Sequence, residues 1–179
     1  MRDETLPGPE GSVPHWNAYL DQLKQYFEEK RGERRMMKTT AKALEVTVAR
    51  NIPAPTSEVF DAWLDPKVPG TLWHEHEKLI FNPKVDGLWY LLTLAHRIAG
   101  TPHYGRFIEI SRPGLIRHSW VSPHTLGEES TVTVRFDKEG DGTRLTLVHS
   151  GLPNEAMANA HEKGWNSILN AFSNVWAHE

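Results

Sequence analysis

The chain has 179 residues, of which 39% are hydrophobic and 24% are charged, and its formal net charge at neutral pH is −3. These values fit one globular domain with room for an appendage, and they exclude a disordered chain or one built mainly of membrane spans. The acidic balance argues against nucleic acid as a partner, and the absence of cysteine excludes disulfides and thiolate chemistry.

The first 43 residues are predicted to form an appendage. Two prolines and two glycines within residues 1–12 predict a flexible tail without the apolar stretch of a signal peptide. Aromatic and aliphatic residues then recur at helical spacing from Trp16 to Phe27, which predicts an amphipathic helix followed by a basic linker. An apolar helix face of this kind is normally buried against another protein surface, so this helix is a candidate interface for a homodimer or a protein partner.

A different pattern starts at Leu44, where apolar and polar residues alternate through residue 50 and predict a strand. A helix is predicted from Thr56 or Ser57 to just before Pro66. Six further strands are predicted at 78–82, 87–95, 103–111, 115–122, 129–138 and 143–150, with a type II turn at Pro113-Gly114. No helical pattern separates these strands, so the sheet is expected to be antiparallel.

The last element is predicted to be a long helix that begins after Asn154, a good N-cap residue. Trp165, Ile168, Phe172 and neighbouring apolar residues give this helix a wide apolar face, and Gly164 predicts a close approach of another backbone. A sheet of this length curls, and the helix is the element large enough to cover its concave face. We therefore expect an α+β domain over residues 44–179.

Several segments resemble one known family, in the same order along the chain. They are IPAPTSEVFDAW (52–63), GRFIEI (105–110), ESTVTV (129–134), TRLTLVHSGLP (143–153) and HEKGWNSIL (161–169). Over roughly residues 44–176 the chain resembles homologues of the activator of the heat-shock-protein-90 ATPase. The resemblance implies the helix-grip (START-like) fold, in which a curved antiparallel sheet wraps around a long C-terminal helix. It also implies an apolar ligand held between sheet and helix, as in START domains, polyketide cyclases and the birch-pollen allergen.

Strand parity and the apolar helix face predict which side chains meet such a ligand. In the strands at 87–95 and 103–111 both faces carry apolar groups, so parity does not decide which face is inward. In the first of them, Leu88, Tyr90, Leu92 and Leu94 remain an alternative to Trp89, Leu91 and Thr93. The predicted ligand-binding residues are Trp89, Leu91, Phe107, Ile116, His118, Trp120, Val134, Phe136, Leu147, His149, Trp165, Ile168 and Phe172.

Catalytic and metal chemistry find little support in the sequence. An interior His149 or His118 is a candidate general base, but a neutral core histidine is the commoner use of such a residue. The Gly-x-Ser-x-Gly motif is absent. His74 and His76 are spaced as half a zinc site, but no third ligand follows from spacing. We therefore expect neither a metal nor a cofactor.

Three functions are compatible with these observations. The first is a cytoplasmic protein that binds or sequesters a hydrophobic, aromatic small molecule and does not engage membranes. An antibiotic self-resistance or carrier protein is one form of it, and for a radical-forming enediyne Gly114 or Gly105 is a candidate sacrificial glycine. The second is a cyclase-like or hydrolase-like enzyme that uses a cavity histidine. The third is a chaperone-interaction module.

Overall fold

The computed structural model describes residues 44–93 and 100–177, together with Gln25 and Glu28. The chain divides into two units, Met1–Lys42 and Ala43–Glu179, and the sheet belongs to the second. The tail, amphipathic helix and basic linker predicted for residues 1–43 lie outside the described residues, apart from those two positions.

The described part of the second unit combines seven strands with a long helix. In chain order the elements are β1 (Leu44–Ile52), α2 (Thr56–Trp63), β2 (Lys78–Phe81), β3 (Leu88–Leu92), β4 (Pro102–Ser111), β5 (Leu115–Trp120), the 3-10 turn η2 (Pro123–Thr125), β6 (Ser130–Glu139), β7 (Gly142–Leu152) and α3 (Glu155–Asn174). The sheet order is β1-β7-β6-β5-β4-β3-β2, and every neighbouring pair is antiparallel. The predicted α+β helix-grip fold is confirmed.

The strand register brings the inward-facing apolar residues of the central strands side by side. On β6 and β7, Val132 lies opposite His149 and Val134 opposite Leu147. These residues are buried, whereas Thr133 between the two valines is only half-buried and the next residue, Arg135, is exposed. Because side chains alternate between the two faces of a strand, this register gives the sheet one continuous apolar face.

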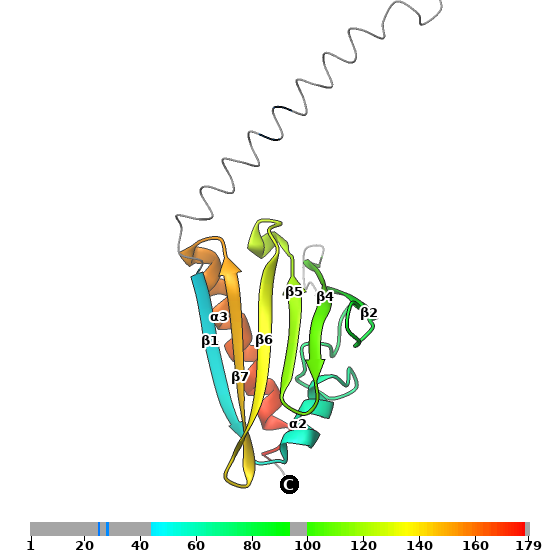
Figure 1. Cartoon of the computed structure of the whole chain (residues 1–179), viewed down its shortest axis with the longest axis vertical. Coiled ribbons are helices and arrows are strands. Elements are labelled where there is room, and N and C mark those ends of the chain that lie inside the picture. The colour runs from blue at the N-terminus through cyan, green and yellow to red at the C-terminus, as the bar shows by residue number, and fades with distance from the viewer. Residues whose placement is uncertain (1–24, 26–27, 29–43, 94–99, 178–179) are drawn as a thin grey trace, which may run out of the picture. The chain divides into compact units, whose positions relative to one another are not determined.

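Helix α3 covers that face and packs mainly against β1 and β7 (Figure 1). It begins after Asn154, whose side-chain Oδ1 accepts a hydrogen bond from the Met157 N–H at 2.9 Å. Its buried residues are spaced three or four positions apart, as a helix requires to turn one face to the sheet. They are Ala158, His161, Trp165, Leu169 and Phe172.

Two local features differ from the sequence predictions. The turn between β4 and β5 is not of type II, because the Arg112–Pro113 peptide bond is cis and the Gly114 N–H donates to the Ser111 carbonyl at 2.8 Å. Proline therefore occupies the third position of the turn, as in type VI turns. At Gly164 on α3, a Cβ atom would meet no atom within 4 Å, so no other backbone approaches it closely.

Candidate functional site

A pocket of about 550 Å³ lies between α3 and the part of the sheet that the helix does not fill. Its walls come from α3, from the loop between α2 and β2, and from the neighbouring ends of β3, β4 and β5. The lining residues are Gly70, Thr71, Leu72, His74, His76, Leu91, Thr93, His103, Trp120, His124, Ala160, His161, Gly164, Trp165, Ser167, Ile168 and Ala171. The described lining contains no lysine, arginine, aspartate or glutamate, so it carries no permanent charge.

Small residues on α3 make room for the pocket. Ala160, Gly164, Ser167 and Ala171 recur at helical spacing and line it together. Gly164 leaves free space on this face of the helix, because no neighbouring atom lies within 4 Å of the position that its Cβ would occupy. A larger side chain at this position would therefore extend into the pocket.

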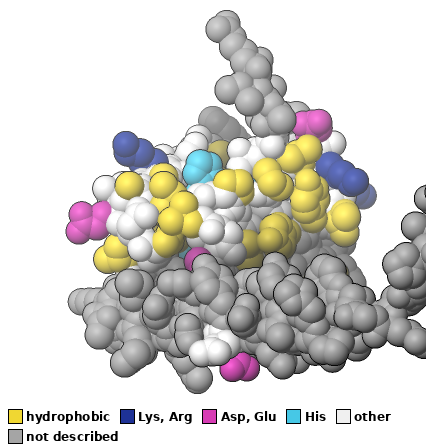
Figure 2. All heavy atoms as spheres, turned by 90° about the horizontal axis from the view of Figure 1, so that it is seen from above, with side chains coloured by type: hydrophobic (Ala, Val, Ile, Leu, Met, Phe, Trp, Pro, Cys, Tyr) yellow, Lys and Arg dark blue, Asp and Glu magenta, His cyan; other side chains and the backbone are white. Residues whose placement is uncertain are grey.

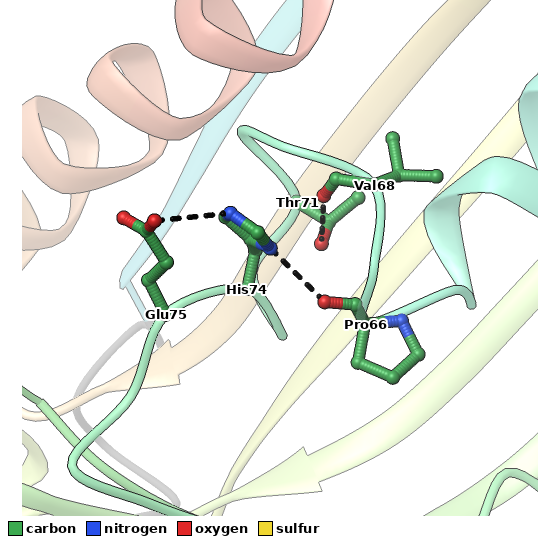
Figure 3. Close-up of polar contacts among 5 residues, drawn as sticks. All are labelled: Pro66, Val68, Thr71, His74 and Glu75. Atoms are coloured by element: carbon green, nitrogen blue, oxygen red, sulfur yellow. Dashed lines mark hydrogen bonds and ion pairs between the residues drawn. The ribbon is translucent and has the colours of Figure 1, made fainter.

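The loop between α2 and β2 forms the opposite wall and is held by local hydrogen bonds (Figure 3). The Thr71 hydroxyl donates to the Val68 carbonyl at 3.1 Å, and His74 Nδ1–H donates to the Pro66 carbonyl at 3.1 Å. The other ring nitrogen of His74 lies 3.4 Å from the Glu75 carboxylate. At Gly70 the loop meets α3 directly, because a Cβ there would lie 2.5 Å from the Ala171 carbonyl carbon.

Aromatic rings make up much of the remaining wall. Trp120 on β5 packs against Trp165 on α3 and against His103 on β4, with ring centroids 5.2 Å and 4.9 Å apart. The end of the molecule at which β5 ends and β6 begins is seen from above in Figure 2. There a histidine lies among hydrophobic side chains, and charged side chains lie toward the margins. The pocket thus offers flat, apolar contact surface to a ligand.

Two lining histidines, His103 and His161, are held in a defined protonation state. Each ring donates its Nδ1–H to a backbone carbonyl, that of Thr101 at 3.0 Å for His103 and that of Met157 at 2.8 Å for His161. Burial lowers the pKa of His103 to about 4, with the neighbouring His124 and His161 adding to the effect. Burial also lowers the pKa of His161. Both rings are therefore neutral at pH 7.

His149 is buried behind the pocket wall, where both of its ring nitrogens take part in a chain of hydrogen bonds. Trp165 donates its indole N–H to His149 Nδ1 at 3.1 Å, so the ring proton must be on Nε2. That nitrogen lies 2.7 Å from the Ser130 hydroxyl, which itself donates to the Trp120 carbonyl at 2.9 Å. Burial lowers the pKa of His149 to about 2.

This arrangement prevents His149 from acting as a base on Ser130. A base that activates a serine must accept the hydroxyl proton on its unprotonated nitrogen. Here the nitrogen that faces Ser130 carries the proton, and the hydroxyl proton is already used on a backbone carbonyl. The geometry is that of a structural histidine that positions Trp165.

Four of the thirteen predicted ligand-binding residues line the pocket, namely Leu91, Trp120, Trp165 and Ile168. In β3 the face of Trp89 and Leu91 is buried and Leu88 is exposed, which decides the alternative left open by parity. The other nine predicted residues are buried but do not line the pocket: Trp89, Phe107, Ile116, His118, Val134, Phe136, Leu147, His149 and Phe172. They fill the space between sheet and helix that the prediction had assigned to ligand.

The two glycines considered for a sacrificial role, Gly105 and Gly114, do not line the pocket either. At Gly105 the chain passes so close to β5 that a Cβ would lie 2.1 Å from the Ser119 carbonyl oxygen. Gly114 belongs to the turn at the opposite end of the β4–β5 hairpin from Trp120. The glycines that do line the pocket are Gly70 and Gly164.

Sequence reasoning missed the loop residues Gly70, Thr71 and Leu72 and did not assign His103, His161 or Gly164 to ligand contact. The spacing of His161, Gly164 and Trp165 along one helix face was the available signal for the α3 side. Within the described residues, no group of three or more histidine, aspartate or glutamate side chains is arranged to hold a metal ion. No helix in that part of the chain is long and apolar enough to cross a membrane.

A curved antiparallel sheet closed by a long C-terminal helix, with a pocket between them, defines a helix-grip protein. The model of one family, described as "Activator of Hsp90 ATPase homolog 1-like protein", matches residues 53–177. The chain belongs to this family.

Solved structures share the fold at low sequence identity. The protein CV1439 from Chromobacterium violaceum is 21% identical with a TM-score of 0.63, over 76% of this chain and 99% of that one. CalU16 from Micromonospora echinospora is 23% identical with a TM-score of 0.57, over 76% and 78% of the two chains. DynU16, from the dynemicin biosynthetic locus, is 18% identical with a TM-score of 0.61, over 75% and 47%. No curated protein matches the chain.

Proposed function

We propose that this chain binds a hydrophobic, aromatic small molecule in the pocket beside α3 and thereby carries or sequesters it. The observation that supports this most directly is the pocket itself, whose volume of about 550 Å³ is typical of sites for small organic ligands. Most of its lining surface is apolar, two tryptophans contribute to it, and the described lining residues carry no permanent charge. An uncharged aromatic molecule loses little solvation on entering such a site and gains contact with Trp120 and Trp165.

We expect the substitution Gly164→Leu to block the site without harming the fold. The leucine side chain would extend into open space, and leucine favours a helix more than glycine does by up to about 1 kcal/mol. Pyrene, an uncharged aromatic probe, should bind the unchanged protein and quench its tryptophan fluorescence. Binding to the variant should be weaker by about tenfold or more, because the site is then overfilled.

The neighbouring substitution Lys163→Leu is the matched control, since it adds the same side chain to the same helix at an exposed position that does not line the pocket. It should leave pyrene affinity unchanged, and thermal melting should show both variants folded. Equal pyrene affinity in all three proteins would show that the ligand does not occupy this pocket.

We further propose that the natural ligand is a secondary metabolite that the protein withholds or carries, with antibiotics as the first class to examine. The support is the fold shared with DynU16, a protein of the dynemicin biosynthetic locus. Titration of the same three proteins with dynemicin, followed by tryptophan fluorescence, tests this finer assignment. Dynemicin affinity that Gly164→Leu does not reduce would count against it.

A further inference from the structure

The hydrogen-bonding groups of the pocket define the ligand more closely than its apolar surface does. His103 and His161 are almost fully buried, with 9% and 8% of their surfaces exposed, and both line the pocket. In each ring Nδ1–H is used on a backbone carbonyl, so Nε2 carries a lone pair and no proton. Each of these two rings therefore presents one imidazole acceptor to the pocket.

These two acceptors have no partner within the described part of the chain. Neither Nε2 atom makes a hydrogen bond to a described residue, and neither is among the buried polar atoms that are sealed from solvent. They are thus accessible from the pocket and are left for water or for a ligand. Burying such an acceptor under a ligand that offers no donor costs free energy, because its bond to water is lost.

The absence of charged residues from the described lining favours an uncharged hydrogen-bond donor on the ligand. A cationic ligand would find no carboxylate among the described lining residues, and an anionic ligand would find no lysine or arginine there. A neutral donor on an aromatic frame satisfies both the imidazole nitrogens and the rings of Trp120 and Trp165. A phenolic hydroxyl is the strongest neutral donor that such a frame carries.

We propose that the ligand is a hydroxylated aromatic compound whose phenolic O–H donates to Nε2 of His103 or His161. This inference rests on the proposed binding function and specifies the class of its ligand. It gives the two histidines the role of selecting hydroxylated over plain or O-methylated aromatic molecules, while the tryptophans supply contact area.

The test compares β-naphthol with its methyl ether, a pair that shares one ring system and differs in the hydroxyl proton. Dissociation constants are measured by calorimetry or tryptophan quenching on the full chain at pH 7.5. We expect β-naphthol to bind about fivefold more tightly, which corresponds to one hydrogen bond of ordinary net strength. In the double variant His103→Phe/His161→Phe this preference should disappear, with affinity for the methyl ether retained or increased.

The two single variants show which ring accepts the hydrogen bond, and they supply independent proteins should the double variant fail to fold. Ile168→Ala is the matched control, because it shortens an apolar lining residue. It should weaken both probes alike and preserve the preference for β-naphthol.

The outcomes separate this inference from the function on which it rests. Equal binding of both probes by the unchanged protein, or a preference that survives every histidine variant, would overturn the inference and leave an apolar binding pocket. Failure of the protein to bind either probe would count against the proposed function as well.

Discussion

Gly70 is the point at which the loop between α2 and β2 touches the backbone of α3. Its φ angle is +76°, a backbone conformation that residues with a Cβ rarely adopt. A Cβ there would also lie 2.5 Å from the Ala171 carbonyl carbon and 2.7 Å from the Phe172 nitrogen. Any larger residue must therefore push one wall of the pocket away from the other.

We expect Gly70→Ala to lower the free energy of unfolding by about 2–3 kcal/mol, measured by denaturant titration. Gly127→Ala is a matched control, because Gly127 has a φ of +75° but no atom within 4 Å of a Cβ. That control should cost about 1 kcal/mol, the conformational part alone. If the Gly70→Ala variant is as stable as the Gly127→Ala variant, the close contact between Gly70 and α3 does not contribute to stability.

Helix α3 supplies the whole helical side of the pocket, so its first turn matters beyond its own stability. In that turn the Met157 N–H donates to the Asn154 cap, and the Met157 carbonyl accepts the Nδ1–H of His161 from the following turn. If the turn unwinds, the Met157 carbonyl moves and the His161 ring is no longer fixed. Capping is thus linked to the orientation of a pocket residue.

We expect Asn154→Ala to lower the free energy of unfolding by about 1 kcal/mol, because the Met157 N–H loses its acceptor. Asn154→Ser should retain most of the stability, since serine is also a good cap residue. Chemical denaturation of the three proteins measures both effects. A serine variant as unstable as the alanine variant would contradict the capping role.

At the scale of the whole molecule, buried histidines make stability depend on pH. Burial lowers the pKa of His118 to about 4 and that of His149 to about 2, against 6.5 for an ordinary histidine. As pH falls below 6.5 the unfolded chain takes up protons that the folded chain does not. Stability from these neutral rings is therefore fully present above pH 6.5 and is lost progressively on acidification through their folded pKa values.

We expect the free energy of unfolding to fall between pH 6.5 and pH 4, at roughly 1.4 kcal/mol per pH unit for each such histidine. His118→Phe should reduce the slope of the free energy of unfolding against pH by the contribution of one histidine, because it removes a titrating group from the core. Denaturant titrations at several pH values measure the slope. An unchanged slope in the variant would show that His118 is not neutral in the folded protein.

Much of the fold could be predicted because the relevant signals are local. Alternation in segments such as Val132–Phe136 places one set of side chains on the buried face, whatever the rest of the chain does. The three- and four-residue spacing from His161 to Phe172 similarly fixes the buried face of α3. The strand boundaries predicted for β4 to β7 consequently lie within two residues of the observed ones.

The pocket could not be derived in this way, because it depends on contacts between residues far apart in the sequence. Parity correctly turned Val134 and Leu147 inward, but only the docking of α3 decides that they fill the core and leave the space near Trp120 open. His149 likewise bonds to Ser130 across the β6–β7 pair, which parity did not reveal.

The sequence by itself determined the elements, their order and, where apolar and polar residues alternate clearly, which face of an element is buried, since these follow from residue-by-residue periodicity. Only the tertiary structure decided where the ligand space lies and which atoms face it. Gly70 meets α3 a hundred residues further along the chain, and the tautomers of His103 and His161 depend on backbone carbonyls placed by folding. The position of the pocket and the atoms that face it thus depend on how the elements pack together, and packing involves the whole chain.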